Sequence, residues 1–160
     1  MSPNHFVLRE QEYGAFLSAL RKLRADAFAK VVFLVDKNGT LLASTGEAAG
    51  FDTTALASLA AGNIAATGGL ANLIGEKEFS ILFHEGERDH LHLSIVGKRA
   101  ILVVHFDART TLGIVRLRAK GASDELNRIF AGLERKAGAP GASGPFAEIT
   151  DDDIDNLFRG

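Results

Sequence analysis

The fold depends on the stretch Lys30-Val-Val-Phe-Leu-Val-Asp-Lys-Asn-Gly-Thr-Leu-Leu-Ala-Ser44. Its first part, Lys30–Val35, is rich in β-branched and aromatic residues, Asp36–Gly39 is typical of a tight turn, and Thr40–Ser44 resumes the extended pattern. The stretch therefore predicts a β-hairpin. Because its first strand is apolar almost without interruption, we expect helices on both faces of the sheet.

Helices are predicted on either side of this hairpin. Apolar residues recur at steps of three and four from Glu10 to Ala25, which indicates an amphipathic helix. A second helix is predicted from Thr53 to Ile74, with Asp52 as its N-cap and Gly75 as its C-terminal stop. The residues expected on its buried face are Leu56, Leu59, Ala60, Asn63, Thr67, Leu70 and Ile74.

Three more strands and a long helix complete the pattern. The strands are predicted at Phe79–His84, Asp89–Val96 and Ala100–Phe106, and their short connections indicate a meander. Thr110 or Thr111 caps the last helix. The order αββαβββα predicts an α/β fold with a five-stranded antiparallel sheet between helices.

Such a sheet leaves at least one edge open, and open edges are either blunted or paired with another chain. The third strand carries Ile81, Leu82 and Phe83 without a Pro or a Lys among them. We therefore predict that this strand is the edge at which two copies of the chain pair.

Composition excludes several classes of function. The 160 residues are 46% hydrophobic and contain no Cys, so disulfides, thiolate nucleophiles and Cys-based metal sites are absent. With a formal net charge of -2 and no basic run, we expect no nucleic-acid binding. The first residues show no signal peptide, and we expect no apolar run to span a membrane, so the prediction is a cytoplasmic protein without direct membrane insertion.

The C-terminal part differs from the rest in composition. Residues 1–136 are predicted to form one domain, and residues 137–145 a flexible linker of Gly, Pro, Ser and Ala. Residues 146–160 combine acidic and apolar residues at helical spacing, which predicts an amphipathic docking helix. Packing of this tail on its own domain and an inert acidic end are the alternatives. The apolar docking residues predicted for the tail are Ile149, Ile154, Leu157 and Phe158.

Catalytic and metal sites are not predicted. His90 and His92 point to one face of a strand, and His84 and His105 could fall nearby on adjacent strands, but two ligands do not make a site. Each His is more simply explained as a polar residue on a solvated sheet surface. There is no nucleophile-elbow pattern, and we expect neither a metal nor a cofactor.

Small residues gather on the second predicted helix. Its Gly-rich segment, 62–69, lacks the Lys and Ser or Thr that a phosphate loop requires. Small residues let another backbone approach closely, although each Gly costs about 1 kcal/mol of helix propensity. A contact surface is therefore predicted, with a helix break near Gly68 as the alternative. The small residues opposite the expected core face are Ser58, Ala61, Gly62, Ala65, Gly69 and Asn72.

These segments in this order resemble the Roadblock family, and within it the bacterial MglB proteins. The resemblance is carried by the hairpin, by the helix opening at Asp52 with Ala61-Gly-Asn63 and Gly68-Gly-Leu70, and by the acidic tail. It implies a homodimer with sheets joined edge to edge. It further implies a GTPase-activating partner of a small Ras-like GTPase (MglA-like) in cell polarity and motility, located at a cell pole only through its partners.

The resemblance also implies how the GTPase is bound. Two protomers would engage one GTPase through their second helices, without an inserted arginine finger. The contact residues carried over are Ala61, Ala65, Gly68, Gly69 and Asn72. The tail would bind the GTPase at a second site and assist nucleotide exchange. A non-activating scaffold or light-chain-like dimer is the alternative, and an arginine finger would have to come from Arg88 or Arg99 on the strand connections.

Overall fold

The computed structural model describes residues 10–47 and 50–138. In this part of the chain the order αββαβββα is confirmed. The last helix ends at Gly138, slightly beyond the domain boundary expected at residue 136. The elements are α1 (Glu10–Ala27), β1 (Val31–Asp36), β2 (Leu41–Gly46), α2 (Thr53–Leu73), β3 (Ile81–Glu85), β4 (His90–Val96), β5 (Ala100–Phe106) and α3 (Leu112–Gly138).

The strands form one antiparallel sheet in the order β2-β1-β5-β4-β3. The predicted hairpin (β1–β2) and meander (β3–β4–β5) are both confirmed. A central pairing of β1 with β5 joins them, with Val31 opposite His105 and Asp36 opposite Ala100. β2 and β3 are therefore the edge strands, so the edge position predicted for β3 is confirmed.

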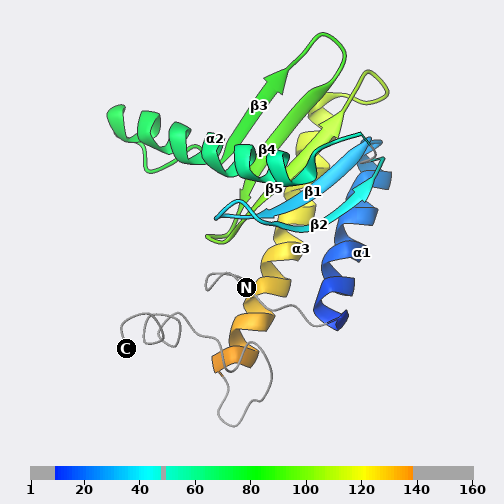
Figure 1. Ribbon diagram of the computed structural model, residues 1–160, viewed down its shortest axis with the longest axis vertical. Helices are drawn as coiled ribbons and strands as arrows, with labels where there is room; N and C mark the ends of the chain where they lie inside the picture. The colour runs from blue at the N-terminus through cyan, green and yellow to red at the C-terminus, as the bar shows by residue number, and fades with distance from the viewer. Residues whose placement is uncertain (1–9, 48–49, 139–160) are drawn as a thin grey trace.

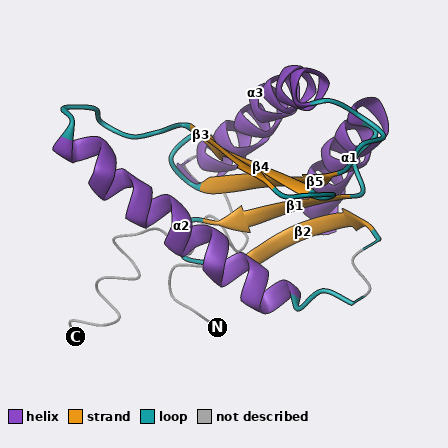
Figure 2. Cartoon of the chain, turned by 90° about the horizontal axis from the view of Figure 1, so that it is seen from above, coloured by secondary structure: helices purple, strands orange, loops and turns teal. Residues whose placement is uncertain are grey.

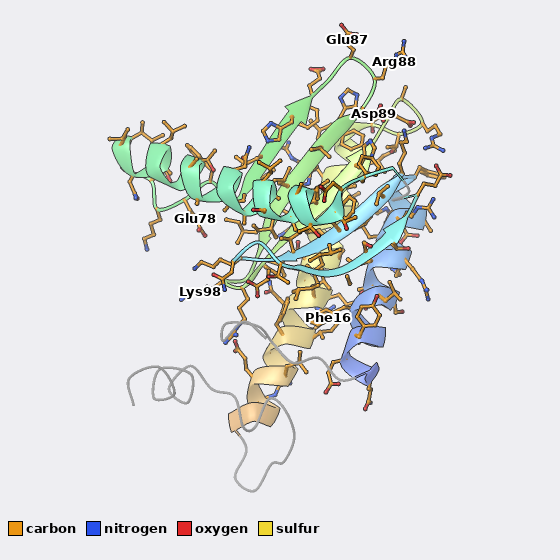
Figure 3. The ribbon with its side chains drawn as sticks, viewed as in Figure 1. Phe16, Glu78, Glu87, Arg88, Asp89 and Lys98 are labelled. Atoms are coloured by element: carbon orange, nitrogen blue, oxygen red, sulfur yellow. The ribbon has the colours of Figure 1, made fainter. Side chains whose placement is uncertain are left out.

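Helices cover both faces of the sheet, as expected from the apolar β1. Figures 1 and 2 show α1 and α3 side by side on one face and α2 alone on the other. The larger core lies under α1 and α3. There the rings of Phe16 and Phe130 have centroids 4.8 Å apart, and Figure 3 labels Phe16 on α1. Leu20, Leu102 and Leu126 are fully buried in the same cluster.

A smaller core lies under α2, which packs on β1, β2 and β5. The fully buried residues on its helix side are Ala57 and Ala60, so α2 lies close to the sheet. The β1–β2 turn shows how close. Gly39 has a φ of 96°, and a Cβ there would be 3.3 Å from the Cα of Ser58. A side chain at Gly39 would therefore strain the turn and push α2 away.

The face of α2 that contacts the sheet differs from the expected one. Ala60 is buried and Leu56 packs against the core, but Leu59, Leu70 and Ile74 are 73%, 57% and 69% exposed. Their assignment to the core was wrong. The helix is apolar on most sides, so its sequence does not mark the buried one. Its C-terminal half extends past β3 (Figures 1 and 2), where the described chain buries Ala71 but leaves Leu70 and Leu73 exposed.

The expectation that no stretch could span a membrane also needs correction. By length and composition α2 is the one helix in the described part of the chain that could do so. Only 17% of its most apolar window is buried. However, its N-terminal half is packed on the chain's own sheet, and Asn63 and Asn72 lie within it. Length and composition do not distinguish a membrane span from a helix that docks on protein.

Helix ends follow local hydrogen bonding. Asp52 caps α2, because its Oδ1 accepts a hydrogen bond from the Ala55 amide at 3.0 Å, and Thr111 caps α3 through a 3.3 Å bond from the Ile114 amide. α1 ends in a Schellman motif, in which Phe28 has a φ of 56°. Glycine normally takes that position. Phe28 is nevertheless 63% exposed.

Candidate protein-docking surface

The glycines of α2 have no structural role within the described chain. A Cβ added at Gly62, Gly68 or Gly69 would meet no heavy atom within 4 Å. Glycine in a helix interior costs about 0.5–1 kcal/mol relative to alanine. Because contacts inside the described chain do not require these glycines, the free space above them is available to another molecule.

The predicted contact residues lie on α2 at different depths. Ala65, Gly69 and Asn72 are exposed, and Gly68 is half-buried. Ala61 is half-buried against the core under α2, so its expected place on the outer face was wrong. The helical turn is continuous through Gly68, so the alternative of a break there is also wrong.

Large apolar residues on the same helix and at its C-cap, Ile74, were missed as surface residues. Leu59, Leu70, Leu73 and Ile74 are all more than half exposed, and Leu73 reaches 83%. From Thr53 to Gly75 the sequence has no charged residue. The sequence carried a signal for this surface, because a helix that is uncharged and apolar on all sides is normally covered by other protein or by a membrane. Here the described chain covers only part of it.

A cleft lies between the N-terminal half of α2 and strands β3, β4 and β5. Because α2 packs on β1, β2 and β5, it covers little of the β3–β4 surface. The cleft holds about 460 Å³, and Leu59 and Asn63 of α2 line it opposite Leu91 and Leu93 of β4. The Asn63 Oδ1 is buried without a hydrogen-bond partner. The overhanging end of α2 and this cleft thus leave apolar surface uncovered on the same side of the sheet.

The β3 edge carries apolar residues on both faces of the sheet: Leu82 lies on the α2 side, whereas Phe83 stacks on Phe106 on the side of α1 and α3. Ile81 and Phe83 are 41% and 37% exposed, and Leu82 is half-buried against the core under α2. β3 pairs with β4 along one side only, so its other row of backbone groups is open within the described chain. This edge can add a strand from another chain.

The two arginines considered as fingers differ in their surroundings. Arg99 pairs with Glu134 of α3, which directs it to the face opposite α2. Arg88 is exposed in the β3–β4 turn, and Figure 3 shows it beside Glu87 at the tip of that hairpin. Neither arginine lies on α2.

The histidines do not gather into a metal site in the part of the chain that the structure describes. His84 and His105 are not on adjacent strands, because Leu91 of β4 lies between them. The expectation of solvated histidines is wrong for His92 and His105, which are 1% and 7% exposed. Burial lowers the pKa of His92, helped by the charge of Arg116.

A polar corner fixes the β3–β4 hairpin to the sheet. Asp89 Oδ1 lies 3.0 Å from both Lys30 Nζ and His105 Nε2. The hydrogen bonds from Lys30 and then His105 lower the pKa of Asp89. The ring of Phe51, just before α2, meets His105 edge-on at 5.3 Å. The corner joins β1, β5, the hairpin and the start of α2, and so positions the docking surface.

The fold defines a small α/β module with a largely uncovered helix, and sequence comparison identifies its class. The Roadblock/LC7 domain matches residues 16–106, more than half of the chain, and the chain belongs to the Roadblock/LC7 family. Comparison with curated proteins gave no match.

Within this class the chain is similar to solved MglB structures. Myxococcus xanthus MglB is 58% identical with a TM-score of 0.75, and the match covers 79% of this chain and 95% of that one. Gliding protein MglB from Thermus thermophilus is 35% identical with a TM-score of 0.76, covering 82% and 99%. An MglB with a tetrameric arrangement is 33% identical with a TM-score of 0.77, covering 82% and 98%. The resemblance to MglB proteins drawn from the sequence is thereby confirmed.

The predicted tail site is outside this description. Ile149, Ile154, Leu157 and Phe158 lie beyond the described residues, as does the predicted linker from residue 139 onward. Their role stays a prediction.

Proposed function

We propose that this chain is a homodimeric GTPase-activating protein for a small Ras-like, MglA-like GTPase, and that it regulates cell polarity or gliding motility. The proposal is supported by 58% identity to Myxococcus xanthus MglB and by a relative described as a gliding protein. The observation that carries it is the uncharged outer face of α2, whose glycines serve no contact in the described chain. The chain would act in the cytoplasm and reach a cell pole through its partners.

The homodimer would form at the β3 edge. A twofold axis beside β3 would pair Ile81, Leu82 and Phe83 with the same residues of a second copy, which continues the sheet across both chains. The same axis would carry the overhanging end of each α2 toward the cleft of the other chain. Leu70 and Leu73 are the exposed residues suited to fill an apolar cleft of about 460 Å³.

The GTPase would bind across the paired α2 helices, two protomers to one GTPase. Ala65, Gly68, Gly69 and Asn72 would let its backbone approach closely. GTP hydrolysis depends on positioning and charge stabilisation, so a partner that holds the switch loops accelerates it without adding a side chain. The absence of charge on α2 supports this mode over an inserted arginine. The tail would bind at a second site and aid nucleotide exchange.

The test is single-turnover GTP hydrolysis by the cognate GTPase, with and without this protein. We expect acceleration by the wild type and none by Ala65→Arg, since Ala65 is exposed on α2 and a long charged side chain there blocks close approach. Circular dichroism and dimer mass should be unchanged in the variant. Binding without acceleration by the wild type would favour a scaffold, and wild-type activity in Ala65→Arg would place the GTPase elsewhere.

Tail and edge variants test the remaining parts. Deleting residues 146–160 should keep basal stimulation but weaken affinity or exchange, whereas loss of the fold would assign the tail to the core.

Phe83→Lys places a charge on the β3 edge, where Phe83 is 37% exposed. This variant should be a folded monomer by light scattering. If it dimerises as the wild type does, the β3 edge is not the dimer interface.

A further inference from the structure

A second apolar groove lies on the opposite face of the molecule from α2, between α1 and α3. It holds about 550 Å³ and is called the α1–α3 groove below. Leu133 is buried and Ile129 half-buried at its floor, whereas Arg128 and Arg135 are exposed at its rim. The groove thus combines apolar depth with a basic border. Its principal lining residues are Ala15, Arg128, Ile129, Gly132, Leu133 and Arg135.

The basic border has a defined geometry. Arg128 and Arg135 are seven residues apart on α3, so they lie on the same side of the helix, roughly 10 Å apart along its axis. Glu12, the acidic residue that lines the groove, is buried. Gly132 lies between the two arginines, and a Cβ there would meet only the Arg135 Nη2, at 3.8 Å. Gly132 therefore keeps the groove open.

The chain itself supplies a segment of matching chemistry. Residues 146–160 carry Glu148, the run Asp151–Asp153 and Asp155, against Arg159 as the one base. Large apolar residues interrupt the acidic ones. Such a segment offers carboxylates to the rim and apolar side chains to the floor.

The tail starts beside the groove and is long enough to fold back. α3 ends at Gly138, one turn beyond Arg135, and Arg128 lies roughly 15 Å back along the axis. Residues 139–145 can span about 23–25 Å when extended. A tether of this length also holds the tail at an effective concentration on the order of millimolar, so a weak site suffices.

We propose that the α1–α3 groove binds the acidic C-terminal segment of the same chain, residues 146–160. The proposal goes beyond the function proposed above, since it concerns where the tail lies when no GTPase is bound. The carboxylates of the tail lie at Arg128 and Arg135, and its apolar residues cover Ile129 and Leu133. A tail held in this way is withheld from other partners until one competes for it.

The test uses the full-length chain without any GTPase, so its outcome is independent of the proposed function. Because the chain has no Cys, Asn156→Cys places a single nitroxide spin label in the tail. We expect the label to broaden the NMR amide signals of Ala15, Ile129 and Gly132, and to leave those of Ala65 and Gly69 on α2 sharp. Broadening on α2 instead, or nowhere, would overturn the proposal.

Two kinds of variant separate charge from shape. Arg128→Glu with Arg135→Glu should abolish the broadening, while the matched control Lys120→Glu, exposed on α3 outside the groove, should retain it. Gly132→Leu fills the groove without changing its charge and should also release the tail. Raised salt should weaken the broadening, since the rim charges are exposed. Persistent broadening in both groove variants would show that the groove is not the site.

The remaining occupants are distinguished in the same system. Isotope-labelled chain mixed with spin-labelled, unlabelled chain reports only contacts between copies, and broadening confined to that mixture would assign the groove to the tail of a second copy. A label at Asn4 tests the N-terminal residues. Broadening of the groove from Asn4 but not from Asn156 would overturn the proposal in favour of the N-terminus.

Discussion

Replacing Gly69 with alanine separates the stability of α2 from its role in binding. Gly69 is exposed within the helix, and an added Cβ meets no atom within 4 Å. The alanine therefore gains helix propensity without strain, about 0.5–1 kcal/mol, which raises the Tm by about 1–4 °C. If a GTPase backbone lies against this position, the methyl group overpacks that contact at a cost of about 1–3 kcal/mol.

The assay measures both quantities on the same protein. Thermal unfolding gives the Tm, and titration of the protein into GTP-loaded GTPase gives the concentration needed for half-maximal hydrolysis, which should rise about 5- to 150-fold for Gly69→Ala. Gly121→Ala is the matched control, because Gly121 is also exposed within a helix, α3, with no atom within 4 Å of an added Cβ. It should raise the Tm equally without changing the titration.

Three results are informative. A more stable Gly69→Ala protein with wild-type titration would refute close approach at this position. A lower Tm would refute the inference that the space above Gly69 is free in the protein as it exists. If Gly121→Ala also raised the concentration needed for half-maximal hydrolysis, the titration would be responding to helix stiffness and not to contact.

Three further predictions concern stability and assembly. Phe28→Gly should raise the free energy of unfolding by about 0.5–1 kcal/mol in urea denaturation, because Phe28 has a φ of 56° at a position that suits glycine. A lower free energy of unfolding in the variant would mean that the Phe28 ring makes stabilising contacts. His92→Leu should stabilise the protein by about 1–3 kcal/mol at pH 7.5, because both ring nitrogens are buried without hydrogen-bond partners. Burial lowers the pKa of His92, so below about pH 6.5 the unfolded chain binds the proton first. The wild type should therefore lose at most about 1.4 kcal/mol from this group between pH 7.5 and 5.5, and an equal pH dependence in His92→Leu would refute that assignment. Leu73→Asp, at a residue that is 83% exposed, should leave the circular dichroism spectrum unchanged and weaken the dimer in sedimentation, and an unaltered dimer would place the end of α2 outside the interface.

Local signals were sufficient for the element order. The turn at Asp36–Gly39, the continuous apolar β1 and the caps at Asp52 and Thr111 each rest on neighbours in sequence, and the structure confirms them. The edge position of β3 was predicted from its apolar residues without a Pro or a Lys among them, and the strand order confirms it. The pairing of β1 with β5 did not follow, since it joins distant segments.

The orientation of α2 could not be predicted, for a physical reason. Alanine and leucine surround the helix, so no polar face marks the side away from the core. Ala57 is buried while Leu59 is exposed, because close packing on the sheet favours small side chains. The burial of His92 and His105 could not be predicted either. His92 is covered by α3 and His105 by Phe51, and the sequences of their own strands do not show this.

The central position of β1 affects synthesis of the chain. Its main-chain partner β5 follows roughly 70 residues later, so a nascent chain that has already exposed Val31–Val35 must wait for Ile101–His105. At about 5–20 residues per second this interval lasts about 4–14 s. During that time the apolar strand β1 has only β2 beside it and an open edge on its other side. The ribosome-bound intermediate therefore exposes an unpaired apolar edge, which favours aggregation until β5 is synthesised.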